Sequence, residues 1–340
     1  MIPKKVILDC DPGSDDAIAM MLAMKSDAID LIGVTTVNGN RIVSKTTENA
    51  LRVVQFMKSS VPVYRGCEEP IICNEIPGRK PGLPRVTLND CHGDFLPLPE
   101  AEIRTEKEHA VFYLVKTLME SEGDIYVAAV GPLTNLAMAL RIEPKIAGKI
   151  KQLVIMGGGH CGANASPAAE FNFYADPEAA KIVMDSAIPK VILPLDATWR
   201  ACLSEEKCKE LAQLGTPEAK VAAALVQKRI DNLKVNDVSE HNYALRHQAG
   251  TVAGAMLYRY DNHMAPIHDA LAIAYLINEN VVTELADANV DIDIAGGLCD
   301  GRMVADFHNT KKSKAPVTAK VALNSDAGLF TDMLFAALGK

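Results

Sequence analysis

The sequence of 340 residues predicts an α/β protein with a mainly parallel sheet flanked by helices. Short apolar runs with the composition of buried strands alternate with longer segments of helical character over most of the chain. From Val281 onward, apolar and polar residues alternate as in antiparallel strands, so the sheet is predicted to be mixed. No internal repeat and no low-complexity linker interrupts the pattern, and we therefore predict one domain over residues 1–340.

The elements follow in order from this alternation. The predicted strands are residues 6–8, 30–37, 61–64, 125–130, 151–156, 191–195, 290–294, 302–305 and 317–321. The predicted helices are residues 17–24, 44–58, 106–120, 136–140, 176–186, 204–214, 218–233, 270–277 and 327–338. Residues 66–100 are expected to form a long connection, and residues 234–264 are polar and mixed. Parallel strands joined by right-handed crossovers place ligands beyond the carboxyl ends of the strands.

Composition excludes several classes of partner. A net charge of −8 does not favour nucleic acid or an anionic membrane as a partner, and no apolar run has the length of a membrane span. The first strand begins directly after residue 5, which leaves no room for a signal peptide. The eight cysteines form no CxxC pair and are expected to be reduced thiols. We therefore expect a cytoplasmic protein that binds neither nucleic acid nor membrane.

Four acidic residues surround the first strand-to-helix corner. Asp9 and Asp11 are two residues apart, so they would share one face of an extended segment. Asp15 and Asp16 fall at the start of the following helix, where an acid can cap free amides and suits the helix dipole. Helix capping explains one or two of the acids, but not all four.

Mutual repulsion makes such a cluster costly unless it is compensated. The sequence offers no Lys or Arg between Lys5 and Lys25. A bound cation is the natural remedy, and carboxylate oxygens suit a hard ion such as Ca²⁺ or Mg²⁺. Asn40 follows the second predicted strand, so its side chain is expected to face the same crevice as the acids.

Several segments in this order resemble one family. They are DCDPGSDDAIAM at residues 9–20, TTVNGN at 35–40, CHG at 91–93, VGPLTNLA at 130–137, VIMGGG at 154–159, SPAAEFNFYADPEAA at 166–180 and PIHDALAIAYLI at 266–277. The chain is thereby similar to the nucleoside hydrolases, the inosine–uridine-preferring nucleosidase superfamily. The resemblance implies an open Rossmann-like fold with a mixed, mainly parallel eight-stranded sheet, assembled as a homodimer or homotetramer. It also implies hydrolysis of the N-glycosidic bond of ribonucleosides to ribose and free base, an activity of nucleoside salvage.

The resemblance implies a calcium site as well. Its ligands would be Asp11, Asp16, Asp269 and the backbone carbonyl of Val130, with the remaining positions taken by the ribose 2′- and 3′-hydroxyls and the attacking water. Asp11 would be the general base that activates this water. Asp15 would accept a hydrogen bond from the 2′-hydroxyl.

Further positions are assigned to the ribose and the base by the same resemblance. Matching positions for the ribose hydroxyls are Asn40, Asn164, Glu170 and Asn172. His268 is a candidate acid for the leaving base, His92 is expected to shape the pocket, and Tyr260 would place an aromatic ring beside the base. The single tryptophan, Trp199, follows a different strand, so a tryptophan sandwich around a purine is not expected. Base preference stays open between purine and pyrimidine.

Two alternatives to this hydrolase remain. One is a nucleoside- or ribose-binding protein of the same fold without catalysis. The other is a phosphohydrolase, because an Asp-x-Asp pair after a strand also opens phosphatases of the haloacid dehalogenase type. The absence of a recognisable downstream Lys and Asp set disfavours the second alternative.

Overall fold

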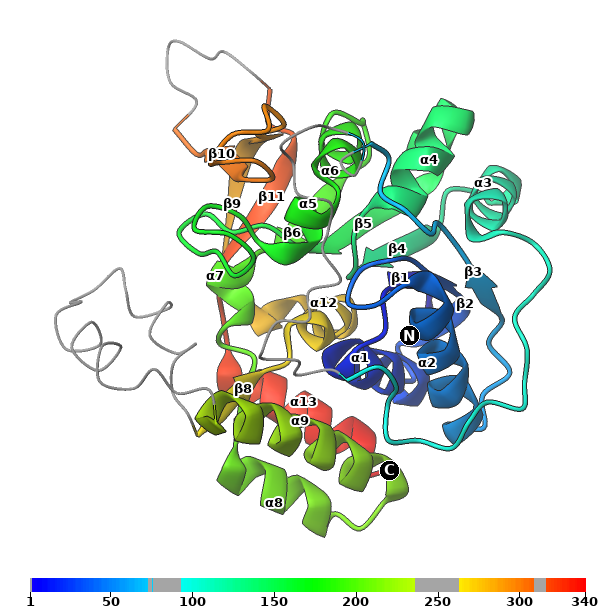
Figure 1. The fold of residues 1–340 in the computed structure, drawn as a ribbon, viewed down its shortest axis with the longest axis vertical. Coiled ribbons are helices and arrows are strands. Elements are labelled where there is room, and N and C mark those ends of the chain that lie inside the picture. The colour runs from blue at the N-terminus through cyan, green and yellow to red at the C-terminus, as the bar shows by residue number, and fades with distance from the viewer. Residues whose placement is uncertain (1, 73–74, 76–92, 236–262, 309–315) are drawn as a thin grey trace, which may run out of the picture.

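The computed structural model describes residues 2–72, 75, 93–235, 263–308 and 316–340. Their main sheet has the strand order β10-β9-β11-β6-β5-β4-β1-β2-β3 (Figure 1). The strands are β1 (Lys4–Cys10), β2 (Ile29–Thr36), β3 (Val63–Arg65), β4 (Ile125–Ala129), β5 (Ile150–Met156), β6 (Lys190–Leu193), β9 (Val282–Ile292), β10 (Met303–Asp306) and β11 (Ala319–Ser325). From β3 to β11 neighbouring strands are parallel, whereas β9 pairs antiparallel with β11 and with β10.

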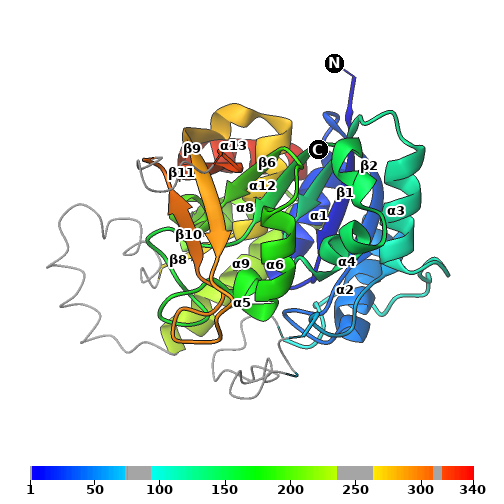
Figure 2. The ribbon, with the colours of Figure 1, turned by 90° about the horizontal axis from the view of Figure 1, so that it is seen from above.

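The helices complete the predicted alternation. They are α1 (Ser14–Lys25), α2 (Val43–Phe56), α3 (Ala110–Glu120), α4 (Thr134–Ile142), α5 (Phe171–Ala175), α6 (Pro177–Met184), α7 (Leu195–Thr198), α8 (Glu205–Gln213), α9 (Pro217–Val235), α12 (His268–Ile277) and α13 (Ala327–Leu338), with 3-10 turns at Pro144–Lys149 and Glu279–Val281. Figure 2 shows the sheet after a quarter turn, with β9 and β10 at the left and β2 at the right. The α/β class and the mixed, mainly parallel sheet are thus confirmed.

The strand count implied by the resemblance was one too low, whereas each of the nine strands predicted from the sequence pattern corresponds to a strand of the main sheet. The described part of the chain places nine strands in the main sheet, not eight. The resemblance supplied the number eight, whereas β9, β10 and β11 all extend the sheet beyond β6. A separate two-stranded ribbon, β7 (Cys202–Ser204) with β8 (Met264–Pro266), was not predicted, because three-residue strands carry too short a pattern to be recognised.

The two faces of the sheet are covered by two cores. Along β1, Val6 and Leu8 pack with α1, α2, α9, α12 and α13, whereas Ile7 packs with α3, α4 and α6 on the opposite face. This division follows from the alternation of side chains along a strand, and burial on both faces explains the continuous apolar run. Helix α1 is buried almost all round, since it lies between the sheet, α12 and α9. An apolar helix is expected in such a position.

The strand order reverses between β1 and β4. The chain runs outward from β1 through β2 to β3, and then returns to form β4, β5 and β6 on the other side of β1. Ligands of open α/β sheets bind at the carboxyl ends of the strands beside such a reversal. The corner after β1 and the residues after β4 both border this point, so the fold places the acidic segment where a ligand is expected. No helix in the described part of the chain is long and apolar enough to cross a membrane.

Candidate functional site

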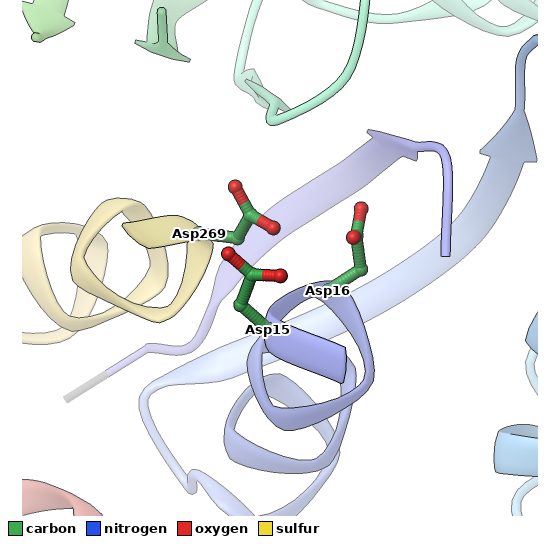
Figure 3. Close-up of side chains that lie close together, drawn as sticks. All are labelled: Asp15, Asp16 and Asp269. Carbon is green, nitrogen blue, oxygen red and sulfur yellow. The ribbon is translucent and has the colours of Figure 1, made fainter. Parts of the chain in front are cut away.

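Three carboxylates from two helices converge at the reversal point. Asp15 and Asp16 lie in the first turn of α1, and Asp269 is the second residue of α12. One carboxylate oxygen from each lies within 4.8 Å of the others, and all three side chains are buried. Figure 3 shows the three carboxylates around one small space. Helices α1 and α12 pack together over the sheet, which explains how Asp16 and Asp269, 253 positions apart in the chain, meet.

Asp11 joins this cluster from the turn after β1. Its Oδ2 accepts a hydrogen bond from the backbone N–H of Asn40 at 2.6 Å, and its own N–H donates to Asp16 Oδ1 at 3.1 Å. The Asp11 carboxylate also fills the space in which Gly39 and Gly131 would carry a Cβ, so both positions require glycine. We refer to Asp11, Asp15, Asp16 and Asp269 as the acid cluster.

Burial and mutual repulsion both act on the acid cluster. Burial is the main cause that raises the pKa of Asp11 well above its usual value, and the charge of Asp16 adds to it. For Asp269, burial again leads in raising the pKa, followed by the charges of Asp15, Asp16 and Asp11. A divalent cation would relieve this repulsion, and carboxylates with a backbone carbonyl are the donors that hard cations take. The residues present therefore fit a metal ion.

The carbonyl of Val130 lies at the same place. Val130 directly follows β4, and the neighbouring Gly131 borders the Asp11 carboxylate. The Val130 oxygen accepts a hydrogen bond from Asn172 Nδ2 at 2.8 Å, and Asn172 Nδ2 also donates to the oxygen of Met156 at 3.0 Å. A carbonyl oxygen has a second lone pair, so this contact is compatible with a metal ligand. Asn172 thus orients the carbonyl of Val130, which the family resemblance implies as a metal ligand.

Arg229 was not among the site residues predicted from the sequence. Nη1 of Arg229, on α9, lies 2.9 Å from Oδ1 of Asp15, and both side chains are almost buried. The contact has the distance of an ion pair without the alignment of a directed hydrogen bond. No Lys or Arg lies between Lys5 and Lys25, so the positive charge beside Asp15 comes from a helix distant in sequence. No local pattern identifies Arg229, because it reaches Asp15 only through the packing of α9 on α1.

The amide of Asn40 also reaches the acid cluster. Its Nδ2 lies 3.1 Å from the carbonyl oxygen of Asp11 and 3.3 Å from Asp16 Oδ2. Asn40 and two of the acids are therefore in contact, while the role of Asn40 in binding stays a prediction. Asp16 Oδ2 accepts from the Gly13 N–H at 2.9 Å as well, so Asp16 also caps the corner as an acid in a first helical turn can.

Glu170 lies at the N-terminus of α5 and caps it. Its carboxylate accepts N–H hydrogen bonds from Gly158 at 2.8 Å, Asn172 at 2.9 Å and Phe173 at 3.2 Å. Burial raises the pKa of Glu170 to about 7, although these hydrogen bonds oppose the shift. Asn164, in contrast, is exposed, and its Oδ1 accepts the Phe171 N–H at 2.8 Å. Both residues thus shape the segment that carries Asn172.

His268 is the first residue of α12, directly before Asp269, and its Nδ1 lies 2.8 Å from Thr198 Oγ1. His92 and Tyr260 lie outside the described residues. Trp199 is buried, and its ring packs against Gly162. Its ring is therefore part of the core, in agreement with the expectation of no tryptophan sandwich.

Asp9 differs from the other acids of the corner. Its Oδ1 accepts hydrogen bonds from Thr35 Oγ1 at 2.6 Å and Asn135 Nδ2 at 2.8 Å. Burial raises its pKa to about 6, and these two donors counteract the shift. Because β1 ends at Cys10, Asp11 lies beyond the strand, and the expectation of a shared face was wrong. The Asp9 carboxylate contacts Asn135 of α4, whereas the Asp11 carboxylate accepts the Asn40 N–H. Asp9 thus links β1 to β2 and α4 through hydrogen bonds.

The chain is similar to known enzymes over nearly its whole length. A family model described as inosine-uridine preferring nucleoside hydrolase matches residues 6–332. The pyrimidine-specific ribonucleoside hydrolase RihB of Escherichia coli O157:H7 is 36% identical over 333 residues, which cover 96% of this chain and 95% of RihB. A plant nucleoside hydrolase, PpNRh1, superposes with a TM-score of 0.83 at 26% identity, covering 99% of both chains. A purine-preferring ribonucleoside hydrolase from Gardnerella vaginalis gives a TM-score of 0.80 at 25% identity, over 99% of this chain and 98% of that one.

Proposed function

Because this chain belongs to the inosine-uridine preferring nucleoside hydrolase family, and is thus a ribonucleoside N-glycosidase, we propose that it is a Ca²⁺-dependent hydrolase of pyrimidine ribonucleosides. The proposal of a bound metal is supported by the acid cluster, which consists of four buried carboxylates at the reversal point of the sheet. Asp11, Asp16, Asp269 and the carbonyl of Val130 would hold the ion. Calcium is proposed because it accepts many oxygen ligands in flexible geometry, which leaves positions for two ribose hydroxyls and a water.

The choice of base rests on the relatives. RihB, at 36% identity, is named as pyrimidine-specific, whereas the purine-preferring Gardnerella protein is 25% identical. Trp199 is buried in the core, so it does not offer its ring to a purine. Uridine and cytidine are therefore the proposed substrates, with inosine as the first purine to compare.

The bound metal would fix the ribose hydroxyls and lower the pKa of a water. Asp11 takes the proton from that water as it attacks C1′ of the ribose. Asp15 accepts a hydrogen bond from the 2′-hydroxyl. Asn40, which contacts Asp11 and Asp16, and Asn172, which contacts the carbonyl of Val130, would bind ribose hydroxyls. The transition state carries positive charge on the sugar ring, which the surrounding carboxylates favour.

His268 is assigned to the leaving base. Its Nδ1 is engaged by Thr198 Oγ1 at 2.8 Å, so Nε2 is the nitrogen that would serve the base. A proton donated there neutralises the departing base as the C1′–N bond breaks. Asn164 and Glu170 position α5, and His92 and Tyr260 are proposed to enclose the base.

The proposed assembly is a homodimer or homotetramer in the cytoplasm. The assembly is proposed from the family resemblance. The cytoplasmic location is proposed from the free cysteines, since the described ones include three that are buried, Cys10, Cys202 and Cys208. Size-exclusion chromatography with light scattering measures the assembly.

One experiment tests the activity. Uridine, cytidine, inosine, guanosine and adenosine are incubated with the protein, with and without a chelator, and released ribose is measured as reducing sugar. We expect the fastest release from uridine or cytidine, loss with the chelator and recovery with Ca²⁺. Asp269→Ala and Asp11→Ala are expected to abolish release while the circular dichroism spectrum stays unchanged.

Other outcomes separate the alternatives. Nucleoside binding without ribose release would favour a binding protein of this fold. Phosphate release from a phosphomonoester without ribose release would favour a phosphohydrolase. Full activity of Asp269→Ala would refute the proposed metal site.

A further inference from the structure

Two ion pairs join α1 and α9, one at each end of the contact. Arg229 Nη1 lies 2.9 Å from Asp15 Oδ1 at the acid cluster, and Lys25 Nζ lies 2.8 Å from Glu218 Oε1 at the other end. The start of α1 is paired with the later part of α9 and the end of α1 with the start of α9, so the two helices run antiparallel. In each helix the two paired residues are about three turns apart. Only the pair with Arg229 includes a residue of the acid cluster.

Asp15 has two competing roles. A Asp15 oxygen lies within 4.8 Å of oxygens of Asp16 and Asp269, so geometry alone would make Asp15 a ligand of the metal. The proposed mechanism instead requires Asp15 for the ribose 2′-hydroxyl. A divalent cation attracts every carboxylate within reach, and something must therefore decide between these roles.

We propose that Arg229 is a positioning residue that withholds Asp15 from the metal and keeps it for the ribose. The inference rests on the proposed function. The side chains of Arg229 and Asp15 are 11% and 7% exposed, so water screens their attraction poorly. A guanidinium fixed on Oδ1 makes Asp15 a weaker ligand, because any cation bound there would approach a positive charge.

The inference predicts opposite effects on the metal and the nucleoside. In Arg229→Gln, Asp15 is released to the metal, and Ca²⁺ is expected to bind about threefold to tenfold tighter. The same variant is expected to raise KM for uridine about tenfold or more, with a smaller fall in kcat, because the 2′-hydroxyl loses its fixed acceptor. If Arg229 had only a structural role, its replacement would weaken the binding of both the metal and the nucleoside.

The test is a double-mutant cycle read by calorimetry with CaCl2 alone. It compares wild type, Arg229→Gln, Asp15→Asn and the double variant, and the tighter binding is expected to disappear in the double variant. Glu218→Gln is the matched control, since it breaks the other ion pair of the same two helices. It is expected to leave Ca²⁺ affinity and KM unchanged.

Arg229→Lys keeps the positive charge and carries the test if Arg229→Gln does not fold. Its changes are expected in the same direction and smaller. Weaker or unchanged Ca²⁺ binding in the Arg229 variants, equal effects of Glu218→Gln, additive effects in the cycle, or a wild type that binds no Ca²⁺ would overturn the inference. Failure of the proposed function shows separately, as a wild type that binds Ca²⁺ but releases no ribose from any nucleoside.

Discussion

Glu170→Gln tests whether the capping carboxylate of α5 is held against its preference for the protonated form. The side chain is 2% exposed, and burial raises its pKa from 4.5 to about 7. The folded protein therefore binds this proton more tightly than the unfolded chain does. The stability that this group contributes is present at low pH and is lost as pH rises from about 4.5 to about 7.

The magnitude follows from the shift. Between pH 5 and pH 8.5 a change of this size removes about 2.5 kcal/mol from the free energy of unfolding. Glutamine has nearly the shape of the protonated carboxyl and does not titrate in this range. The difference in unfolding free energy between wild type and Glu170→Gln should therefore move by about 2.5 kcal/mol over this interval, in favour of the variant at the higher pH.

The assay is urea unfolding of metal-free protein at both pH values. Other titrating groups occur in both proteins and cancel in the difference. Glu143→Gln is a matched control, because Glu143 caps the 3-10 turn at Pro144–Lys149 through a hydrogen bond that is exposed to solvent. For this control we expect the same difference from wild type at pH 5 and at pH 8.5. A Glu170→Gln difference that stays constant within about 1 kcal/mol would refute the reasoning.

Three further variants test individual contacts. Asn135→Ala removes a donor to the buried Asp9 carboxylate and is expected to lower the free energy of unfolding by about 2–3 kcal/mol in urea titrations. Gly158→Ala is expected to cost about 1–3 kcal/mol in the same assay, since Gly158 has φ +74° and a Cβ there would meet Phe173. Thr198→Val is expected to lower kcat for uridine about threefold to tenfold with little change in KM, because the hydroxyl orients the His268 ring; an unchanged kcat would contradict that role.

The course of the chain through the sheet was predictable because both faces of the sheet are buried. Each parallel strand is an apolar run with a polar residue after it, and this pattern located β1 to β6 and their helices. The tail was predicted to be antiparallel from its alternation, and β9 and β11 confirm this. The ends of the strands were predicted less accurately, since β9 begins at Val282 and not at residue 290. The first part of β9 is largely exposed, so it lacks the apolar alternation that marks its second half.

The acid cluster was predictable only in part. Asp15 and Asp16 are adjacent in sequence, so their shared position needed only one strand-to-helix corner. Asp269 was assigned to the cluster by resemblance, and its approach to them depends on how α12 packs against α1. Arg229 had neither signal, because it lies beside Lys228 in a polar part of its helix, where an arginine suggests a solvated side chain. Contacts formed by packing between distant helices leave no period in the sequence.

The four acids of the first corner are stabilised in different ways, and this difference separates structure from function. Asp9 Oδ1 accepts hydrogen bonds from the neutral donors Thr35 Oγ1 and Asn135 Nδ2, and these two donors oppose the burial that raises the pKa of Asp9 to about 6. Asp15 is met by a fixed positive charge from α9. Asp11 and Asp16 instead lie close to each other and to Asp269, and their contacts with amides do not cancel the burial and the repulsion from Asp16 that raise the pKa of Asp11. A cation binds most strongly where the fold leaves negative charge unbalanced, and we therefore propose that a divalent cation would bind between Asp11, Asp16 and Asp269.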